Sequence, residues 1–375
     1  MIRLSKSCLG NKEKEAVADV LDREYLGMGK EVEQFEIALT KYLGRSAVCV
    51  SNGTAALHLA LQGLDIGYGD EVLVQSLTYV ASFQAISATG AKPIACEIDP
   101  ATFAIDLKDA ERRITKRTKA IMPVHYTGSV GALGEIYKFA EKYKLRVIED
   151  AAHAFGSEYK GKRVGSFGDV ACFSFDGIKN LTCGEGGCVV SEDKKLLSIV
   201  RDARLLGVEK DTEKRYVGER SWEFDVTSQG WRYHMSNIMA AIGNEQLKNF
   251  QNVVDKRRHI AKQYDGYLSC NKSISLINNN YDLVVPHIYV ILLSEEIDRD
   301  RLRKEMADFG VQTGIHWKPN HLLTFYSLGK KNELPVTESL FPRLLTLPLH
   351  TDLTENDVQT VCSTLFNQLS QNTRK

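Results

Sequence analysis

Short apolar runs alternate with helical segments along most of the chain. Apolar residues predict buried strands at 46–50, 71–75, 92–96, 119–124, 146–150, from 169 onward and at 188–191. Between them, helical spacing predicts helices at 55–64, 79–89, 107–114, 133–143 and 194–206. Strand–helix–strand repeats with short Gly, Pro and Asp connections favour parallel pairing. The predicted fold class is therefore α/β, with a mostly parallel central sheet and helices on both faces.

The two ends of the chain have a different pattern. Helical segments are predicted at 12–25 and 32–43, separated by a break at Gly27-Met28-Gly29. After the last strand, 207–230 is polar and predicts a long surface excursion, and the helices expected next are 238–247 and 252–268. Strands at 287–293 and 311–317, with helices at 299–309 and 357–369, then predict a smaller α+β unit. We expect a large domain over 1–250 and a small C-terminal domain over 251–375.

Composition narrows the classes of protein to consider. The 375 residues include 48 Lys+Arg and 48 Asp+Glu, so no global field attracts nucleic acid or an anionic membrane. The sequence predicts no bilayer-spanning run and no signal peptide, which favours a cytoplasmic protein without membrane or nucleic-acid partners. The 8 cysteines form no C-x-x-C pair, so reduced thiols are expected and no metal site.

The stretch 146–187 carries the most chemical information. Asp150 ends one predicted strand, and Lys179 lies in the loop after the next, between Phe173-Ser174-Phe175 and a glycine-rich turn. Open α/β sheets place ligands at the carboxyl ends of their strands. Pyridoxal phosphate (PLP) chemistry needs a lysine that attaches to the cofactor and a carboxylate that keeps its pyridine ring protonated. We interpret Lys179 and Asp150 as this catalytic pair; a solvated surface lysine is the alternative.

A second pattern indicates a seat for phosphate. Ser51-Asn52-Gly53-Thr54 opens the predicted helix 55–64, and such a turn offers hydroxyls and free backbone N–H groups to an anion. The alternative is an ordinary helix cap. The sequence has no G-x-G-x-x-G after the first strand, which argues against a dinucleotide fold.

Several motifs, taken in order, resemble those of one family. They are Ser51 to Leu57, Gly69 to Val72 with Thr78-Tyr79, Glu149 to His153, Phe173 to Asn180 with Gly184 to Gly187, and Met235 to Gln246. Over nearly its whole length the chain resembles the sugar aminotransferases of the DegT/DnrJ/EryC1/StrS family. The resemblance implies PLP fold type I, the aspartate-aminotransferase-like architecture, and action on nucleotide-linked keto-sugars.

The resemblance also implies a role for individual residues. Lys179 matches the lysine that binds PLP and moves the substrate proton, and Asp150 matches the partner of the pyridine nitrogen. The other positions that match cofactor contacts are His153 at the 3-oxygen, Tyr79 over the ring, Thr54, the Ala55 amide and Ser174 at the phosphate, and Asn180 after the lysine. For His153, a packed histidine behind the site is the alternative.

Two segments differ from the family pattern or border the substrate. Gly230 to Met235 reads GWRYHM, where the family commonly has GYNYRM, and Asp176 stands where an aromatic residue or histidine is frequent. Arg232 thus replaces an asparagine that reaches the PLP phosphate of a neighbouring subunit, which implies a homodimer with Arg232 at that phosphate or at the substrate diphosphate. In the segment 314–322, His316 and Lys318 are expected to contact the sugar or its diphosphate; a structural loop is the alternative.

The function implied by the resemblance is a transamination. L-glutamate would convert PLP to pyridoxamine phosphate (PMP), and a nucleotide-linked 4-keto-6-deoxyhexose would receive the amine, giving a 4-amino-4,6-dideoxy sugar for surface polysaccharide such as the O-antigen of lipopolysaccharide. A 3-keto sugar is the nearest alternative. The related dehydratases have histidine in place of Lys179, and a non-catalytic regulator would not need Asp150, Lys179 and Ser174. The nucleotide is left open.

Overall fold

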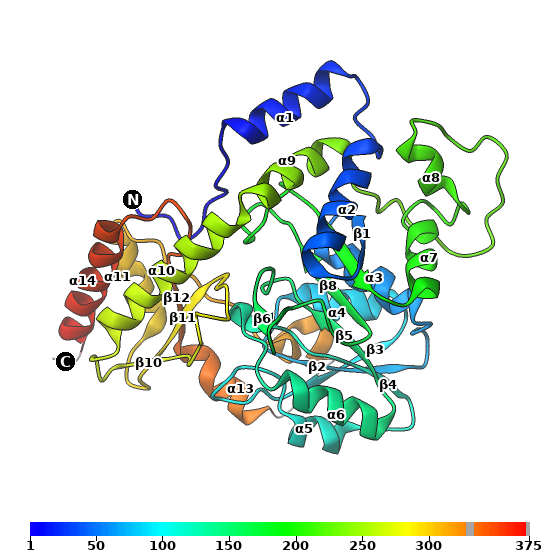
Figure 1. Ribbon diagram of the computed structural model, residues 1–375. Coiled ribbons are helices and arrows are strands. Elements are labelled where there is room, and N and C mark those ends of the chain that lie inside the picture. The colour runs from blue at the N-terminus through cyan, green and yellow to red at the C-terminus, as the bar shows by residue number, and fades with distance from the viewer. Residues whose placement is uncertain (328–333, 373–375) are drawn as a thin grey trace.

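The computed structural model describes residues 1–327 and 334–372. Its largest element is a seven-stranded sheet in the order β1-β9-β8-β5-β4-β2-β3 (Figure 1). The strands are β1 (Ser46–Val50), β2 (Glu71–Gln75), β3 (Lys92–Cys96), β4 (Thr118–Met122), β5 (Arg146–Asp150), β8 (Val170–Ser174) and β9 (Gly187–Ser191). All neighbours pair in parallel except β9, which is antiparallel to β1 and β8. The predicted mostly parallel α/β fold is confirmed.

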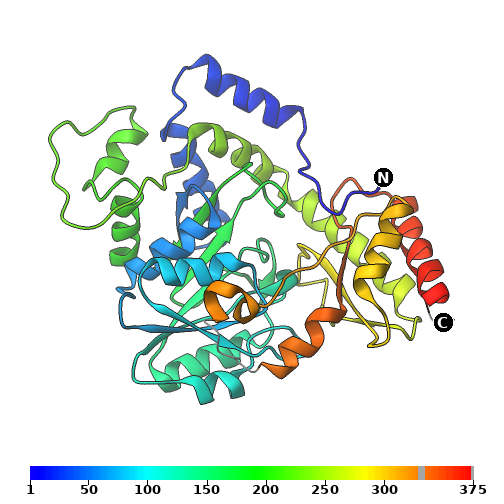
Figure 2. The same cartoon turned by 180° about the vertical axis from the view of Figure 1, so that it is seen from behind.

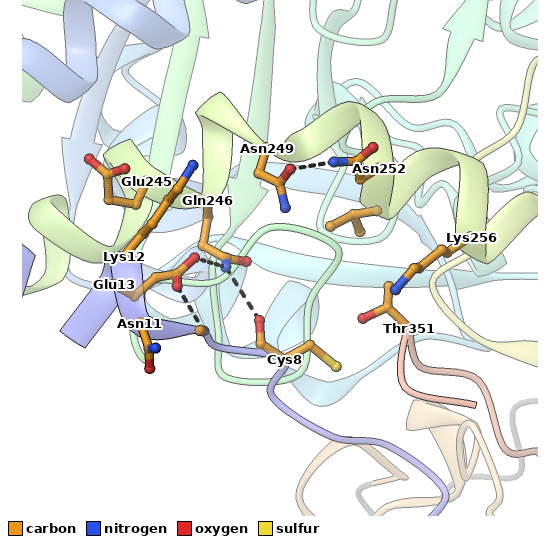
Figure 3. A pocket seen from close by; sticks show the side chains of 12 residues that line it. Cys8, Asn11, Lys12, Glu13, Glu245, Gln246, Asn249, Asn252, Lys256 and Thr351 are labelled. Carbon is orange, nitrogen blue, oxygen red and sulfur yellow. Dashed lines mark hydrogen bonds between the residues drawn. The ribbon is translucent and has the colours of Figure 1, made fainter. Parts of the chain in front are cut away.

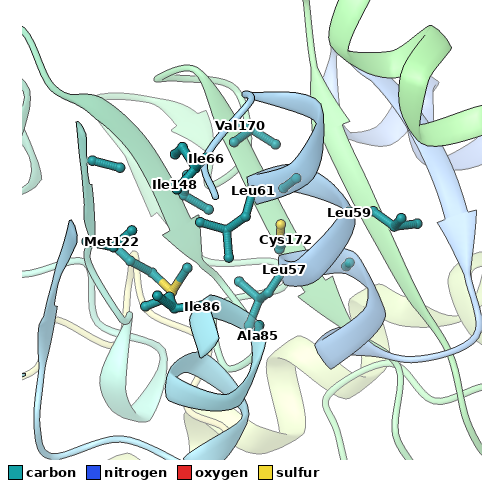
Figure 4. Close-up of a cluster of buried hydrophobic side chains, with 14 of the residues drawn as sticks. Leu57, Leu59, Leu61, Ile66, Ala85, Ile86, Met122, Ile148, Val170 and Cys172 are labelled. Carbon is teal, nitrogen blue, oxygen red and sulfur yellow. The ribbon is translucent and has the colours of Figure 1, made fainter. Parts of the chain in front are cut away.

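Helices cover both faces of this sheet. Successive side chains of each strand point to opposite faces, and because both sets are apolar, both faces must be buried. Val48 and Val50 face the core under α3 (Gly53–Gly63), α4 (Val80–Ala88) and α7 (Lys194–Ala203), on the side turned forward in Figure 2 and enlarged in Figure 4. Ala47 and Cys49 face α2 (Lys30–Leu43) and α9 (Asn237–Lys248). On that second side, α5 (Leu107–Arg113) and α6 (Leu133–Tyr143) cover the part of the sheet around β2 and β4. Burial on both faces explains the continuous apolar runs.

A smaller antiparallel sheet lies beside the large one. It consists of β10 (Ile274–Leu276), β11 (Tyr289–Leu293) and β12 (Leu344–Leu347). It shares a core with α10 (Phe250–Leu268), α11 (Arg299–Asp308) and α14 (Glu355–Asn372). Both chain ends lie on this side of the molecule, and α1 (Asn11–Asp22) follows the N-terminal segment (Figure 1). The helix α10 begins at the predicted division near residue 250, and the division into two domains stays a prediction.

The structure differs from the sequence expectations in a few segments. The predicted strand 311–317 is wrong: only isolated bridges form there, from Val311 to Ile2 and from Gly314 to Thr346. The excursion 207–230 contains a short helix, α8 (Asp211–Tyr216). The sequence does not predict the small-sheet strands β10 and β12. It also does not predict the short elements β6 (Glu158–Tyr159), β7 (Lys162–Arg163), α12 (Thr324–Ser327), α13 (Pro335–Leu340), η1 (Tyr126–Gly128), η2 (Asn320–Leu322) and η3 (Phe341–Arg343). Among the described residues, none of the helices has the length and apolar character needed to cross a bilayer.

Candidate active site

A cavity of about 610 Å³ lies at the carboxyl ends of β5 and β8. Most of the residues that the sequence predicts as site residues line it, namely Thr54, Ala55, Tyr79, Asp150, His153, Ser174, Lys179 and His316. They come from distant parts of the chain, and the parallel sheet brings them to one edge. The cavity is therefore the candidate active site.

The turn between β1 and α3 forms one wall of the cavity. The Asn52 side chain caps α3 by accepting a hydrogen bond from Ala55 N at 2.8 Å. The Ala55 amide, which the resemblance implies as a phosphate donor, is thus already engaged. Gly53 and Thr54 stand at the first two positions of α3, where N–H groups have no acceptor within the helix. A Cβ on Gly53 would lie 2.8 Å from Ser174 Cβ, so glycine lets the helix N-terminus approach Ser174.

Asp150 is held at the end of β5 as a buried carboxylate. It is 5% exposed, accepts a hydrogen bond from Ser82 Oγ at 2.7 Å and accepts another from Ala152 N at 3.2 Å. Burial raises the pKa of Asp150, while the hydrogen bonds from Ser82 and Ala152 act in the opposite direction. A buried carboxylate with two donors and one face on a cavity is suited to pair with a cation there.

Lys179 enters the same cavity from the loop after β8. A turn fixes this loop, since Ile178 N donates to Asp176 Oδ1 at 3.2 Å and Lys179 N donates to Asp176 O at 3.0 Å. The cavity leaves the side chain half-buried, but the surrounding protein still desolvates the amine. Burial lowers the pKa of Lys179 to about 8, against the charges of Asp176 and Asp150. An amine with a lowered pKa is a better nucleophile and base near neutral pH.

Aromatic and imidazole rings form the rest of the wall. Tyr79 lies 5.6 Å from Trp317, and His153 lies 5.0 Å from Trp317 and 4.3 Å from His287, between ring centroids. Burial lowers the pKa of His153 and His287 well below the ordinary value and that of His316 to about 4. The three imidazoles are therefore neutral at physiological pH, and they do not add positive charge beside Lys179.

Three of the residues proposed from the sequence lie elsewhere. Asn180 is buried behind the cavity and donates to the carbonyls of Phe155 at 3.4 Å and Val285 at 3.2 Å. Arg232 and Lys318 are exposed and are not among the described residues that line the cavity. The neighbour of Arg232, Tyr233, does line it.

Sequence reasoning assigns no role to Ser82, His287 and Trp317, although the structure places all three at the site. Ser82 holds Asp150, and His287 and Trp317 line the cavity. Only Trp317 had a local signal, because it lies inside the polar and aromatic segment 314–322. Ser82 and His287 reach the site through contacts with residues more than 60 positions away, such as Asp150 and Lys179.

A second groove, of about 230 Å³, lies near the N-terminal segment and contains none of the proposed site residues (Figure 3). Its buried amide, Gln246, donates to Glu13 Oε1 at 2.6 Å and to Cys8 O at 3.3 Å (Figure 3). The buried amide of this groove is thus already paired, and the groove lacks the lysine and carboxylate pair that the sequence predicts for the site.

The residues of the large cavity fit PLP. A lysine amine, a buried carboxylate and a helix N-terminus with the hydroxyls of Thr54 and Ser174 match an aldehyde, a pyridine nitrogen and a phosphate. The architecture is that of the fold type I PLP enzymes, as the comparison with solved structures shows.

The chain belongs to the DegT/DnrJ/EryC1/StrS aminotransferase family, whose sequence profile matches residues 7–366. An uncharacterized protein of Methanocaldococcus jannaschii is 36% identical over 375 residues, covering 98% of this chain and 97% of that protein. Spr1654 of Streptococcus pneumoniae, assigned as a sugar aminotransferase and solved in its PMP form, has a TM-score of 0.93 and 29% identity, covering 99% of this chain and 100% of that chain. PseC of Helicobacter pylori, an aminotransferase involved in pseudoaminic acid biosynthesis, has a TM-score of 0.91 and 28% identity, with 99% of each chain covered.

Proposed function

We propose that this PLP-dependent sugar aminotransferase transfers the amino group of L-glutamate to a nucleotide-linked 4-keto-6-deoxyhexose. The product would be a 4-amino-4,6-dideoxy sugar nucleotide for surface polysaccharide. The observation that carries the proposal is the meeting of Lys179, Asp150 and the 53–54 helix N-terminus in one cavity of a chain from this family. Two structural neighbours support a sugar as the acceptor: Spr1654, assigned as a sugar aminotransferase, and PseC, an aminotransferase involved in pseudoaminic acid biosynthesis.

The residues that line the cavity each have a proposed role in this reaction. Bound PLP supplies an electron sink that stabilises negative charge at the substrate carbon. Lys179 would anchor the cofactor and would move the substrate proton. Asp150 would supply the negative charge opposite the pyridine nitrogen. Thr54, Ser174 and the first amides of α3 would hold the phosphate, while Tyr79 would cover the ring and His153 would contact its 3-oxygen.

The sugar is proposed to enter past the segment 316–318. His316 lines the cavity, and its Nδ1 lies 2.8 Å from Thr346 Oγ1, which fixes the ring. The Tyr126 hydroxyl donates a hydrogen bond to the backbone carbonyl of His316. Lys318 is exposed one residue after Trp317, and its charge suits the diphosphate of a nucleotide sugar. We propose that His316 contacts the sugar and Lys318 the diphosphate.

A direct assay tests the proposed reaction. Incubation with ¹⁵N-labelled L-glutamate and a panel of nucleotide-linked keto-sugars should transfer the label to C4 of a 6-deoxyhexose, as read by mass spectrometry and NMR. Label at C3 would instead support the 3-keto alternative. Labelled PMP formed from glutamate, without transfer to any keto-sugar, would contradict a sugar acceptor. Absence of any spectral change with glutamate would favour the non-catalytic regulator.

We also propose that the working unit is a homodimer in which Arg232 reaches an anion in the partner's cavity. Trp231 Nε1 donates to Gln62 Oε1 at 2.8 Å, and the Trp231 ring stacks on Tyr233 at 5.8 Å. The two flanking aromatic side chains are thus packed, while Arg232 between them is exposed. An exposed guanidinium between two packed neighbours is suited to bidentate binding of phosphate.

Arg232→Ala should weaken the contact to that anion. If the anion is the PLP phosphate, the Kd for the cofactor should rise and cofactor should be lost on dilution. If it is the substrate diphosphate, only the KM for the nucleotide sugar should rise. Loss of a charge-assisted hydrogen bond should change either constant by about tenfold or more. Arg112→Ala, which removes an exposed arginine of α5, is the matched control and should change neither quantity. Sedimentation velocity tests the assembly, and a fully active monomer would contradict the shared site.

A further inference from the structure

One side chain in direct contact with the Lys179 amine has no role in the proposed reaction. His287 Nε2 lies 3.4 Å from Lys179 Nζ. His287 is 4% exposed and precedes β11, whereas Lys179 follows β8. The imidazole therefore reaches the amine from the side of the small antiparallel sheet, across the cavity from the loop that carries the lysine.

The backbone at His287 is held more firmly than a plain loop requires. His287 N donates to Thr127 O at 2.9 Å, and Arg257 Nη1 donates to the carbonyls of Pro286 at 3.3 Å and His287 at 3.1 Å. Arg257 is 3% exposed, and no carboxylate of the described residues is among the groups that act on its charge. A buried guanidinium without a counter-ion is costly. Here its donors fix the position of one dipeptide at the cavity wall.

The surroundings also decide where the proton of His287 sits. Burial, aided by the charge of Lys179, lowers the pKa of His287 well below its ordinary value, so the ring is neutral. Its Nδ1 is buried without a hydrogen-bond partner among the described residues. An unpaired buried N–H is rarer than an unpaired acceptor. The favoured tautomer thus has its proton on Nε2, directed at Lys179.

We propose that His287 is a positioning residue that donates through Nε2–H to the unprotonated amine of Lys179 and holds it in place while the lysine is detached from the cofactor. The inference rests on the proposed function, because transamination alternates between attached and detached lysine. No proton leaves the imidazole and no covalent bond forms. The contact exists only with the free base, so it stabilises that form over the ammonium.

Other groups also act on the charge of Lys179. The titratable or charged groups that act on it or line the same cavity are Tyr79, Asp150, His153, Cys172, Asp176, Glu185, Tyr233, Arg257, His287 and His316. Asp176 and Asp150 favour the ammonium, whereas burial and Arg257 favour the free amine. All of these except His287 are retained when His287 alone is replaced. A difference between such variants therefore measures the contribution of His287.

The test uses two replacements of similar length. His287→Gln keeps an N–H donor, and His287→Met removes it. In the PMP form of the full chain, the pH dependence of Lys179 acylation by acetic anhydride, followed by peptide mass spectrometry, gives the pKa of the amine. Burial lowers the pKa of Lys179 to about 8 in the protein alone, and each variant is compared with the wild-type midpoint measured in the same PMP form. Loss of one hydrogen bond should raise the midpoint by about one pH unit in His287→Met, and His287→Gln should remain close to wild type. His350→Gln, a buried histidine outside the cavity lining, should leave the midpoint unchanged.

An unchanged or lowered midpoint in His287→Met, with wild-type circular dichroism and PMP content, would overturn the proposal. So would equal midpoints for the Gln and Met variants. If His287→Met does not fold, ¹⁵N NMR of histidine-labelled wild-type protein in its PMP form, recorded above the Lys179 midpoint, decides, because a proton on Nδ1 under those conditions excludes the donation. Borohydride reduction of the PLP form tests the proposed function separately: without a reduced adduct on the Lys179 peptide that function fails, whatever the midpoint.

Discussion

Lys179→Ala should abolish multiple turnover while leaving the fold intact. The alanine has no amine to attach the cofactor and none to carry the substrate proton, and a positioned proton carrier alone contributes about 10²–10⁴-fold. Because Lys179 lies in a loop and is half-buried beside a cavity, its truncation leaves the packed core of the sheet unchanged. Steady-state transfer of ¹⁵N from L-glutamate to the sugar measures the loss.

Two controls make this result specific. Lys256→Ala removes an exposed lysine on α10, which lines only the groove of Figure 3, and should keep wild-type rates. Circular dichroism and size-exclusion elution should match wild type for both variants. Appreciable multiple turnover by Lys179→Ala would reject the assignment of the catalytic lysine, since no other lysine lines the cavity among the described residues.

The large sheet could be predicted because strands that are buried on both faces appear in the sequence as short continuous apolar runs. The runs at β1, β2 and β3 were predicted with the bounds that the structure shows. The direction of β9 leaves no such mark, because an apolar run reads the same in a parallel or an antiparallel pair. The segment 311–317 was predicted as a strand from its composition, yet its partners are single residues at Ile2 and Thr346, far away in the sequence.

The site was predictable to the extent that its groups lie at strand ends. Asp150 ends β5 and Lys179 lies in the loop after β8, so parallel pairing of these neighbouring strands brings both residues to one edge of the sheet. Being next to Lys179 in the sequence does not place Asn180 in the cavity. Its side chain is buried and donates to two backbone carbonyls instead. His287 shows the converse limit, because its contact with Lys179 depends on how the small sheet packs against the large one.

Asp150→Asn should give a folded protein that binds PLP but reacts far more slowly. An opposite charge at close range raises the pKa of a base by about 1–3 units. The amide has no charge, so the protonated fraction of the pyridine nitrogen, and with it the rate of each half-reaction, should fall about 10- to 1,000-fold. Asparagine keeps the size: its one oxygen can accept from Ala152 N, and its NH2 group can donate to the Ser82 hydroxyl, so packing should be preserved. Single-turnover absorbance changes with L-glutamate measure the rate.

Ser82→Ala separates the charge of Asp150 from its placement. This variant removes the 2.7 Å hydrogen bond to Asp150 Oδ2 but leaves the carboxylate and its contact with Ala152. Removing that donor should raise the pKa of Asp150, because the hydrogen bond favours the ionised form. Activity should therefore fall less than in Asp150→Asn at neutral pH, and the loss should grow as the pH is lowered and the carboxyl group becomes protonated.

Near-wild-type rates for Asp150→Asn would assign the pyridine partner to a different acid, and Asp176 is then the next carboxylate in the cavity to replace.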